Sequence, residues 1–289
     1  MGMHLIEQDH SDPRLSIIRD HNATRRAAER RTNYQQNGSQ SLRIGHFVLI
    51  QALQDRNGCH VTKIPSGSRL LDAYLVEAAP SCRPRAALLI FHGVGETVSQ
   101  WVNVQRLLYD HCISSVVFDY SGNGDSSPPG TVRNLHEDAI AAYTHFHTRF
   151  AGVGRVCTLG FSMGNAVLLD AYTQFHTAPD CMIVGGAFSS ARDGAVHAWG
   201  IPRWMAHAFP DQWNNVAAIS RSHPPLLVVH SDADHANPLW MGERIYQAAP
   251  QSKQFVILHG LPHNAACSGP IEQWWASAIR FVQEGGAAR

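Results

Sequence analysis

The fold of this chain is constrained most by a regular alternation of apolar, strand-like runs with amphipathic, helix-like runs, which begins at Ala86. The strand-like runs are apolar on both faces, as in "AALLIFHG" (Ala86–Gly93). Such strands have to be covered on both sides, which is the arrangement of a mostly parallel sheet between two layers of helices. The sequence therefore predicts an α/β fold, an open sheet that binds its ligands at the carboxyl ends of the strands. The predicted strands are Ala86–Gly93, Ile113–Tyr120, Arg155–Phe161, Cys181–Phe188, Pro225–Ser231 and Gln254–Gly260, and the predicted helices are Val98–His111, Leu135–Phe150, Met163–Phe175 and segments from about Leu239 and from Ile271.

The first 45 residues differ from the rest, because they are polar, rich in arginine and poor in large apolar side chains. We expect residues 1–45 to form an N-terminal arm that is partly helical or mobile, with Asn22 able to cap a short helix at Ala23–Arg31. Two further strands are predicted at His46–Leu53 and Arg69–Ala78, on either side of the turn-prone stretch "IPSGS".

The charge balance argues against a polyanionic partner. Lys and Arg number 23 and Asp and Glu number 23, so the formal net charge is zero, and we expect neither nucleic-acid binding nor attraction to an anionic membrane. No run of 18 uncharged apolar residues occurs, so we expect no stable membrane insertion and a cytoplasmic protein. The six cysteines show no CxxC spacing and are expected to be buried free thiols.

No metal site is predicted despite 18 histidines. The nearest pair, His145 and His147, would point to different faces of a helix and could not hold one ion together.

The stretch Gly160-Phe161-Ser162-Met163-Gly164 lies between a predicted strand and a predicted helix. In that setting a sharp turn can present a serine above the sheet in a strained conformation, and the positions two before and two after it must be glycine. The following helix N-terminus would favour a developing negative charge near Ser162. Ser162 is therefore a candidate nucleophile, and the alternative is a serine that only caps the helix.

A serine nucleophile needs a base that is oriented by a carboxylate. The loop after Pro225–Ser231 offers Asp232 and Asp234, and the loop after Gln254–Gly260 offers His263. We prefer Asp234 because it lies beyond the end of the strand, and Asp232 is the fallback. We prefer His263 to His259 because His259 should still belong to the strand and pack there. The order Ser, Asp, His is the one that this strand arrangement requires.

An oxyanion hole needs two backbone N–H groups. One is expected from Met163, directly after Ser162. The other should come from the glycine-containing loop "HGVGE" after Ala86–His92, with Val94 as the donor and Gly95 as the alternative.

Five motifs in order resemble those of the α/β-hydrolase family, in particular its small-lid esterases, monoacylglycerol lipases and serine aminopeptidases. They are "HGVGE" (His92–Glu96), "DYSGNGDSS" (Asp119–Ser127), "GFSMG" (Gly160–Gly164), "HSDADHANP" (His230–Pro238) and "GLPHN" (Gly260–Asn264). The resemblance implies a triad of Ser162, His263 and Asp234, a central, mostly parallel sheet of eight strands, and no cofactor. The chain departs from the family pattern at Ser121, where arginine is usual, and at Ser231, where glycine is usual.

We accordingly expect residues 46–289 to form one hydrolase domain with a small helical lid at about 189–222. Trp199 and Trp204 of the lid, with Trp101 below, are candidates for an apolar substrate pocket, although packing is the alternative for each. The predicted reaction is hydrolysis of a carboxylic ester on a small acyl substrate.

Several alternatives remain open: a thioesterase, an aminopeptidase in which Glu96 could hold the substrate amine, an acyltransferase, or a ligand-binding protein without turnover. The N-terminal arm or the lid could also form a homodimer contact.

Overall fold

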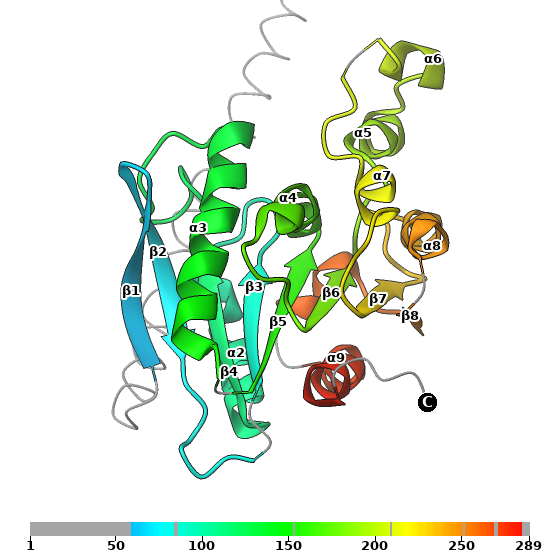
Figure 1. The fold of residues 1–289 in the computed structure, drawn as a ribbon. Helices are drawn as coiled ribbons and strands as arrows, with labels where there is room; N and C mark the ends of the chain where they lie inside the picture. Colours follow the sequence, from blue (N-terminus) through cyan, green and yellow to red (C-terminus); the bar gives the residue numbers. More distant parts are fainter. Residues whose placement is uncertain are drawn as a thin grey trace, which may run out of the picture. The chain divides into compact units, whose positions relative to one another are not determined.

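The computed structural model describes residues 59–83, 86–152, 154–208, 210–250, 252–268 and 271–284 (Figure 1). These residues fall within one compact unit, Ile50–Arg289. The predictions for the arm at residues 1–45, for the helix at Ala23–Arg31 and for the strand at His46–Leu53 lie outside the described residues.

A central sheet of eight strands organises the described part of the chain, in the order β1-β2-β4-β3-β5-β6-β7-β8. The strand β2 runs antiparallel to both of its neighbours, and all other neighbouring pairs are parallel. The predicted mostly parallel sheet is confirmed. The strands are β1 (Cys59–Ser66), β2 (Arg69–Val76), β3 (Ala86–Phe91), β4 (Ile113–Phe118), β5 (Arg155–Phe161), β6 (Cys181–Gly185), β7 (Leu226–Ser231) and β8 (Lys253–Leu258).

Helices cover both faces of this sheet (Figure 1). One apolar core joins the sheet to α3, α4 and α8, and a second joins the opposite face to α2 and α9. Every residue of β3, β4, β6 and β7 is buried, which agrees with strands that were predicted to be apolar on both faces. The helices are α2 (Val102–Asp110), α3 (Val132–Phe150), α4 (Met163–Ala171), α5 (Ala191–Trp199), α6 (Arg203–Ala206), α7 (Asn215–Ile219), α8 (Leu239–Ala248) and α9 (Glu272–Glu284), with 3₁₀ turns η1 (Val98–Trp101), η2 (Tyr172–Gln174) and η3 (His263–Ala266).

The prediction of a turn at "IPSGS" is wrong in part, because its first three residues, Ile64, Pro65 and Ser66, belong to β1. Proline is tolerated there because β1 is at the edge of the sheet formed by the described strands, where β2 is its neighbour. The turn itself is one residue further on, at Gly67, which has a φ of 58°.

The prediction that all cysteines are free is also wrong. Cys157 and Cys181 are register partners on the neighbouring strands β5 and β6, and their Cα atoms lie 4.7 Å apart in a disulfide. Cys82 and Cys112 form a second disulfide, with a Cα–Cα distance of 5.3 Å. Both distances are ordinary for disulfides. The pairing of Cys157 with Cys181 depends on strand register, which spacing along the sequence does not reveal.

The segment between β6 and β7, which we call the insert (residues 189–222), contains the short helices α5, α6 and α7. They lie beyond α8 and the carboxyl ends of the last strands (Figure 1). None of the described helices has the length and apolar character needed to cross a membrane.

Candidate active site

Ser162 stands at the sharp turn between β5 and α4, as predicted. Its backbone has φ 52° and ψ −118°, a region that residues other than glycine rarely occupy. The turn is held by the Ser162 N–H, which donates to the Gly185 carbonyl of the neighbouring strand at 3.1 Å. The side chain is thus presented at the carboxyl edge of the sheet in a fixed position, and the residue is 8% exposed.

The two flanking glycines are required by contact, as the sequence predicted. A β-carbon on Gly164 would lie 1.9 Å from the Phe91 carbonyl oxygen, and one on Gly160 would lie 2.7 Å from the Cα of Asn165. Neither backbone contact could give way cheaply, since both lie in the centre of the sheet and its covering helix. Glycine is therefore required at position 164 because the start of α4 lies directly against the end of β3. We call the sharp turn at Ser162 the elbow.

The structure brings the three preferred residues into one hydrogen-bonded chain. His263 Nε2 lies 3.0 Å from Ser162 Oγ, and His263 Nδ1 lies 2.6 Å from Asp234 Oδ2. The Asp234 side chain is 2% exposed and that of His263 is 24% exposed. The histidine can therefore reach a substrate while the carboxylate behind it stays shielded from water, which strengthens its electrostatic effect.

Asp234 is fixed by the loop in which it lies. Its Oδ1 accepts the backbone N–H groups of Ala236 at 3.0 Å and Asn237 at 2.8 Å, which leaves Oδ2 for His263. The Asn237 side chain in turn donates to the Gly186 carbonyl at 2.8 Å, just beyond the end of β6. The loop of Asp234 is thereby joined to the end of β6.

The two residues that were held as second choices form a separate pair. His259 Nδ1 lies 2.7 Å from Asp232 Oδ2, with the side chains 78% and 40% exposed. The expectation that His259 packs within the strand is wrong, because β8 ends at Leu258 and the imidazole stands in solvent. The Gly260 N–H and His259 lower the pKa of Asp232.

The loop between β3 and η1 contains the predicted second oxyanion donor. Val94 is 73% exposed at the tip of this loop, and Gly95 has a φ of 74°. The loop is held from within by Glu96, whose Oε2 accepts the Gly93 N–H at 2.8 Å and the Trp101 Nε1–H at 3.0 Å. The Val94 and Met163 N–H groups remain the predicted donors to a substrate oxyanion.

Comparison with known proteins agrees with this architecture. Residues 82–213 match the family model of serine aminopeptidase, S33. An uncharacterised protein of Mycobacterium tuberculosis is 27% identical over 206 residues, which are 71% of each chain. An esterase of Pyrococcus furiosus superposes with a TM-score of 0.63 at 13% identity, over 80% of this chain and 94% of that one. A proline iminopeptidase of Mycobacterium smegmatis gives 0.63 at 14% identity, over 78% and 99%.

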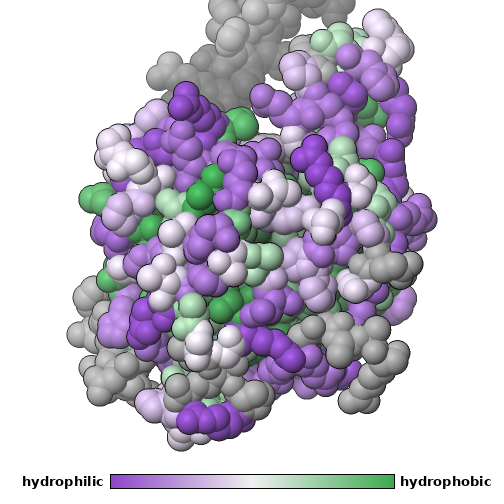
Figure 2. Space-filling view, in the orientation of Figure 1, coloured by the Kyte–Doolittle hydropathy of each residue, from purple (hydrophilic) through white to green (hydrophobic). Residues whose placement is uncertain are grey.

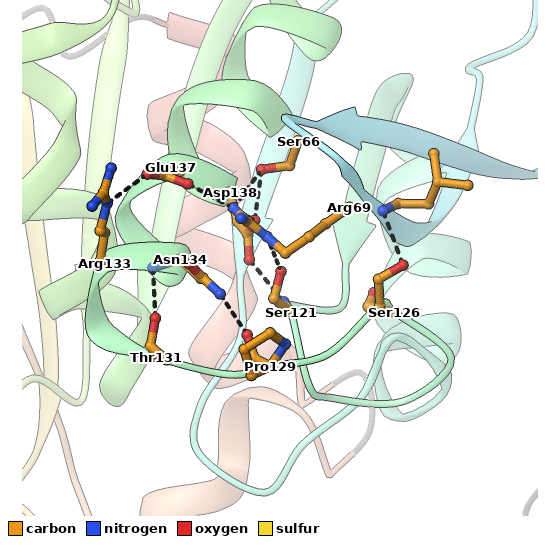
Figure 3. Close-up of polar contacts among 12 residues, drawn as sticks. Ser66, Arg69, Ser121, Ser126, Pro129, Thr131, Arg133, Asn134, Glu137 and Asp138 are labelled. Carbon is orange, nitrogen blue, oxygen red and sulfur yellow. Dashed lines mark hydrogen bonds and ion pairs between the residues drawn. The ribbon is translucent and has the colours of Figure 1, made fainter.

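The chain has the α/β-hydrolase fold, and its sequence resembles proteins of the α/β-hydrolase family. Within this family the turn after β4 usually contains arginine where this hydrolase has Ser121, and here the turn contacts an arginine of another strand. Arg69 of β2 donates from Nε to Ser121 Oγ at 2.9 Å and from Nη2 to Asp138 at 3.2 Å and Glu137 at 2.9 Å (Figure 3). Asp138, on α3, is fully buried and also accepts from Ser121 N and Ser66 Oγ, both at 2.7 Å. A guanidinium from a different strand thus holds this turn.

The second departure of this hydrolase from the family pattern, Ser231, links two loops of the site. Its Oγ donates to the Leu261 carbonyl at 2.6 Å and accepts the Ala233 N–H at 3.2 Å. The serine therefore joins the loop of Asp234 to the loop of His263.

The three tryptophans predicted for a substrate pocket lie in two different environments. Trp101 is fully buried and packs edge-to-face against Phe161 and Trp275. Trp199 and Trp204 of the insert are each 76% exposed. Contact of Trp199 and Trp204 with substrate stays a prediction. Trp101 is a core residue, since it is buried beneath the loop of Val94.

Sequence reasoning missed two polar residues that support the site. Asn165 is fully buried, and its Nδ2 donates to the carbonyls of Ser162 at 3.0 Å and Gly185 at 2.8 Å. His230 is buried beside Asp234, with Nε2 2.7 Å from the Asn237 carbonyl, and burial lowers its pKa. A polar residue inside an otherwise apolar run, as in "MGNAVLLDA" or "LLVVHS", is the signal that could have found each of them.

Proposed function

We propose that this hydrolase cleaves a carboxylic ester in two steps through an acyl-enzyme intermediate on Ser162. The observation that carries the proposal is the continuous chain from Ser162 Oγ through His263 to Asp234, at 3.0 and 2.6 Å, on a strained elbow. A serine that only capped the helix would not need this conformation, and the Ser162 side chain makes no capping hydrogen bond.

In the first step, Ser162 Oγ attacks the substrate carbonyl carbon while His263 Nε2 takes the hydroxyl proton. The negative charge that develops on the carbonyl oxygen is accepted by the N–H groups of Met163 and Val94, with Gly95 as the alternative. Asp234 holds the imidazole in the correct tautomer and stabilises the imidazolium. The alcohol then leaves with the proton from His263, and the acyl group stays on Ser162.

In the second step, His263 takes a proton from water, and the resulting hydroxide attacks the acyl carbon. The tetrahedral intermediate collapses, the acid is released, and Ser162 Oγ regains its proton from His263. Both steps use the same donors and the same base, so the proposal needs no other group.

The test compares matched variants with a panel of p-nitrophenyl esters of rising acyl length. Ser162→Ala and His263→Ala should each lower kcat by about 10⁶-fold, and Asp234→Asn by about 10⁴-fold. The controls are the neighbouring exposed pair, His259→Ala and Asp232→Asn, which should retain activity. Labelling by a fluorophosphonate should occur at Ser162 and disappear in Ser162→Ala. Full activity of Ser162→Ala, or equal losses in His259→Ala, would overturn the proposal.

One observation favours an aminopeptidase as a second candidate. Glu96 Oε1 and Ser162 Cβ both lie close to Gly93, 3.0 and 3.2 Å from the place that a β-carbon on Gly93 would take. Among the described residues, the donor that Oε1 contacts is the Cys267 thiol at 3.4 Å, so this oxygen can still accept from a substrate ammonium.

Aminoacyl p-nitroanilides with free and acetylated amines separate the two candidates. A preference for the free amine that is lost in Glu96→Gln would support the aminopeptidase, since glutamine still accepts from Gly93 and Trp101. Equal rates on the free and the acetylated substrate would argue against the aminopeptidase, and the esterase would remain as the proposed function.

A further inference from the structure

The insert encloses a second polar site that does not include Ser162, His263 or Asp234. A cavity with a volume of about 180 Å³ lies among α5, α6, α7 and α8. One water needs roughly 10–15 Å³ of such a volume, so the cavity can hold a polyatomic ligand. The surface formed by the insert, at the upper right of the space-filling view, is largely hydrophilic (Figure 2).

The lining of this cavity carries more positive than negative charge. Three arginines line it, Arg192, Arg203 and Arg244, against two aspartates, Asp193 and Asp211. An arginine-rich cavity is suited to carboxylate or phosphate groups, because the guanidinium presents several N–H donors in one plane.

The contacts within the cavity show which donors are used. Asp193 Oδ2 accepts from Arg244 Nη1 and Ser189 Oγ, at 2.6 and 2.7 Å. Arg203 reaches Asp193 only with Nη1, at 3.7 Å, which is beyond hydrogen-bond distance. Arg192 is engaged with the Ala206 carbonyl at 3.2 Å.

Arg203 and Arg244 therefore keep most of their donors for a ligand. Each guanidinium has five N–H groups. Within the described ranges, Arg244 makes one side-chain hydrogen bond and Arg203 makes none. Their side chains are 67% and 46% exposed, so both can turn toward the cavity.

We propose that this cavity is an anion site that binds an oxyanion of the phosphate or carboxylate class through Arg203 and Arg244. Asp193 is the internal anion that holds the two arginines in place when the site is empty, and it competes with the ligand for them. The insert also contacts the loop of Asp234, because Nε2 of His197 on α5 lies 3.0 Å from the His235 carbonyl. The oxyanion is either free in solution or part of the substrate.

The probe for the site itself is inorganic phosphate, measured by isothermal titration on the full chain against sodium chloride at equal ionic strength. Wild type should bind phosphate in preference to chloride. Arg203→Gln and Arg244→Gln should each weaken binding by about 10- to 100-fold, as expected for the loss of hydrogen bonds to a charged group. Arg280→Gln, an exposed arginine on α9, is the matched control and should bind as wild type.

Asp193→Asn gives a result of the opposite sign, because it removes the competing anion, so phosphate should bind severalfold more tightly. Each arginine variant is checked by circular dichroism, and Arg203→Gln, with no hydrogen bond to lose, should fold. Binding no tighter than chloride, an equal loss in Arg280→Gln, or weaker binding by folded Asp193→Asn would overturn the proposal.

A pair of esters of equal length, one with a terminal carboxylate and one neutral, distinguishes the two sources of the oxyanion. If the substrate carries it, Arg203→Gln should raise KM for the carboxylate ester alone and leave kcat unchanged. If the ligand is free, phosphate should bind while both KM values stay as in wild type. Either result supports the site, and the phosphate titration does not depend on whether the chain is an esterase.

Discussion

Replacing Arg69 by methionine tests the network that holds the turn after β4. The variant keeps a side chain of similar length but removes the charge that faces Asp138, which is fully buried, while Arg69 itself is only 13% exposed (Figure 3). Removing one partner of a buried ion pair costs about 3–5 kcal/mol of unfolding free energy. Asp138 keeps its hydrogen bonds from Ser66 and Ser121, so we expect the lower end, about 3 kcal/mol.

The assay is urea unfolding followed by tryptophan fluorescence and circular dichroism. With a slope of about 3 kcal/mol per molar urea, the midpoint should fall by about 1 M. The matched control is Arg133→Met, because Arg133 also binds Glu137 at 2.9 Å but is 87% exposed, and its midpoint should not change measurably.

The double variant Arg69→Met with Asp138→Asn supplies the internal check. It removes the buried negative charge together with its partner, so it should recover a large part of the lost stability. If Arg69→Met unfolds at the wild-type midpoint, or if Asp138→Asn adds to the loss instead of reducing it, the network does not work through charge compensation.

Three further predictions concern the elbow and the buried histidine. Gly164→Ala should abolish activity and destabilise the fold, because its β-carbon would lie 1.9 Å from a backbone oxygen; activity and urea midpoint measure this, and a wild-type enzyme would contradict it. Asn165→Ala should cost about 1–3 kcal/mol and lower kcat, since two elbow carbonyls each lose one of their two donors; unchanged kcat and midpoint would contradict that role. Burial lowers the pKa of His230, so the unfolded chain binds more protons below about pH 6.5, and stability should fall as the pH is lowered. His230→Gln should lose less stability between about pH 7 and pH 5, and parallel losses would exclude the histidine as the cause.

The sheet from Ala86 onward could be predicted because each of its central strands is apolar on both faces. That property forces coverage on two sides, whatever the details of packing. The region of β1 could not be predicted equally well, because Pro65 and Gly67 indicate a turn and only the position of β1 at the sheet edge makes the proline acceptable.

The candidate triad could be predicted because the fold limits where its members can come from. Once Ser162 is placed at an elbow, the acid and the base must follow β7 and β8, and only a few residues there are suitable. Asp234 is preferred to Asp232 because it lies beyond the strand end and before Asn237 and Pro238, which precede the next helix. The structure pairs Asp234 with His263 and Asp232 with His259, as two separate contacts.

The supporting contacts of the site could not be predicted, since they join segments far apart in the sequence. Arg69 and Ser121 are 52 positions apart, and Cys267 and Glu96 are 171 apart. Strand register likewise decides the disulfide between Cys157 and Cys181. Such contacts follow from three-dimensional proximity and leave no periodic signal along the chain.

The backbone of Ser162 has a consequence for any attempt to improve this protein by selection. A residue other than glycine held at φ 52° and ψ −118° costs about 1–3 kcal/mol, which the surrounding sheet and α4 must offset. Glycine at this position would relieve that cost, so a screen that rewards heat resistance alone would favour Ser162→Gly and discard the proposed nucleophile. The most stable variant of this chain and its most active variant therefore differ at position 162. Selection for thermal stability must be coupled to an activity assay.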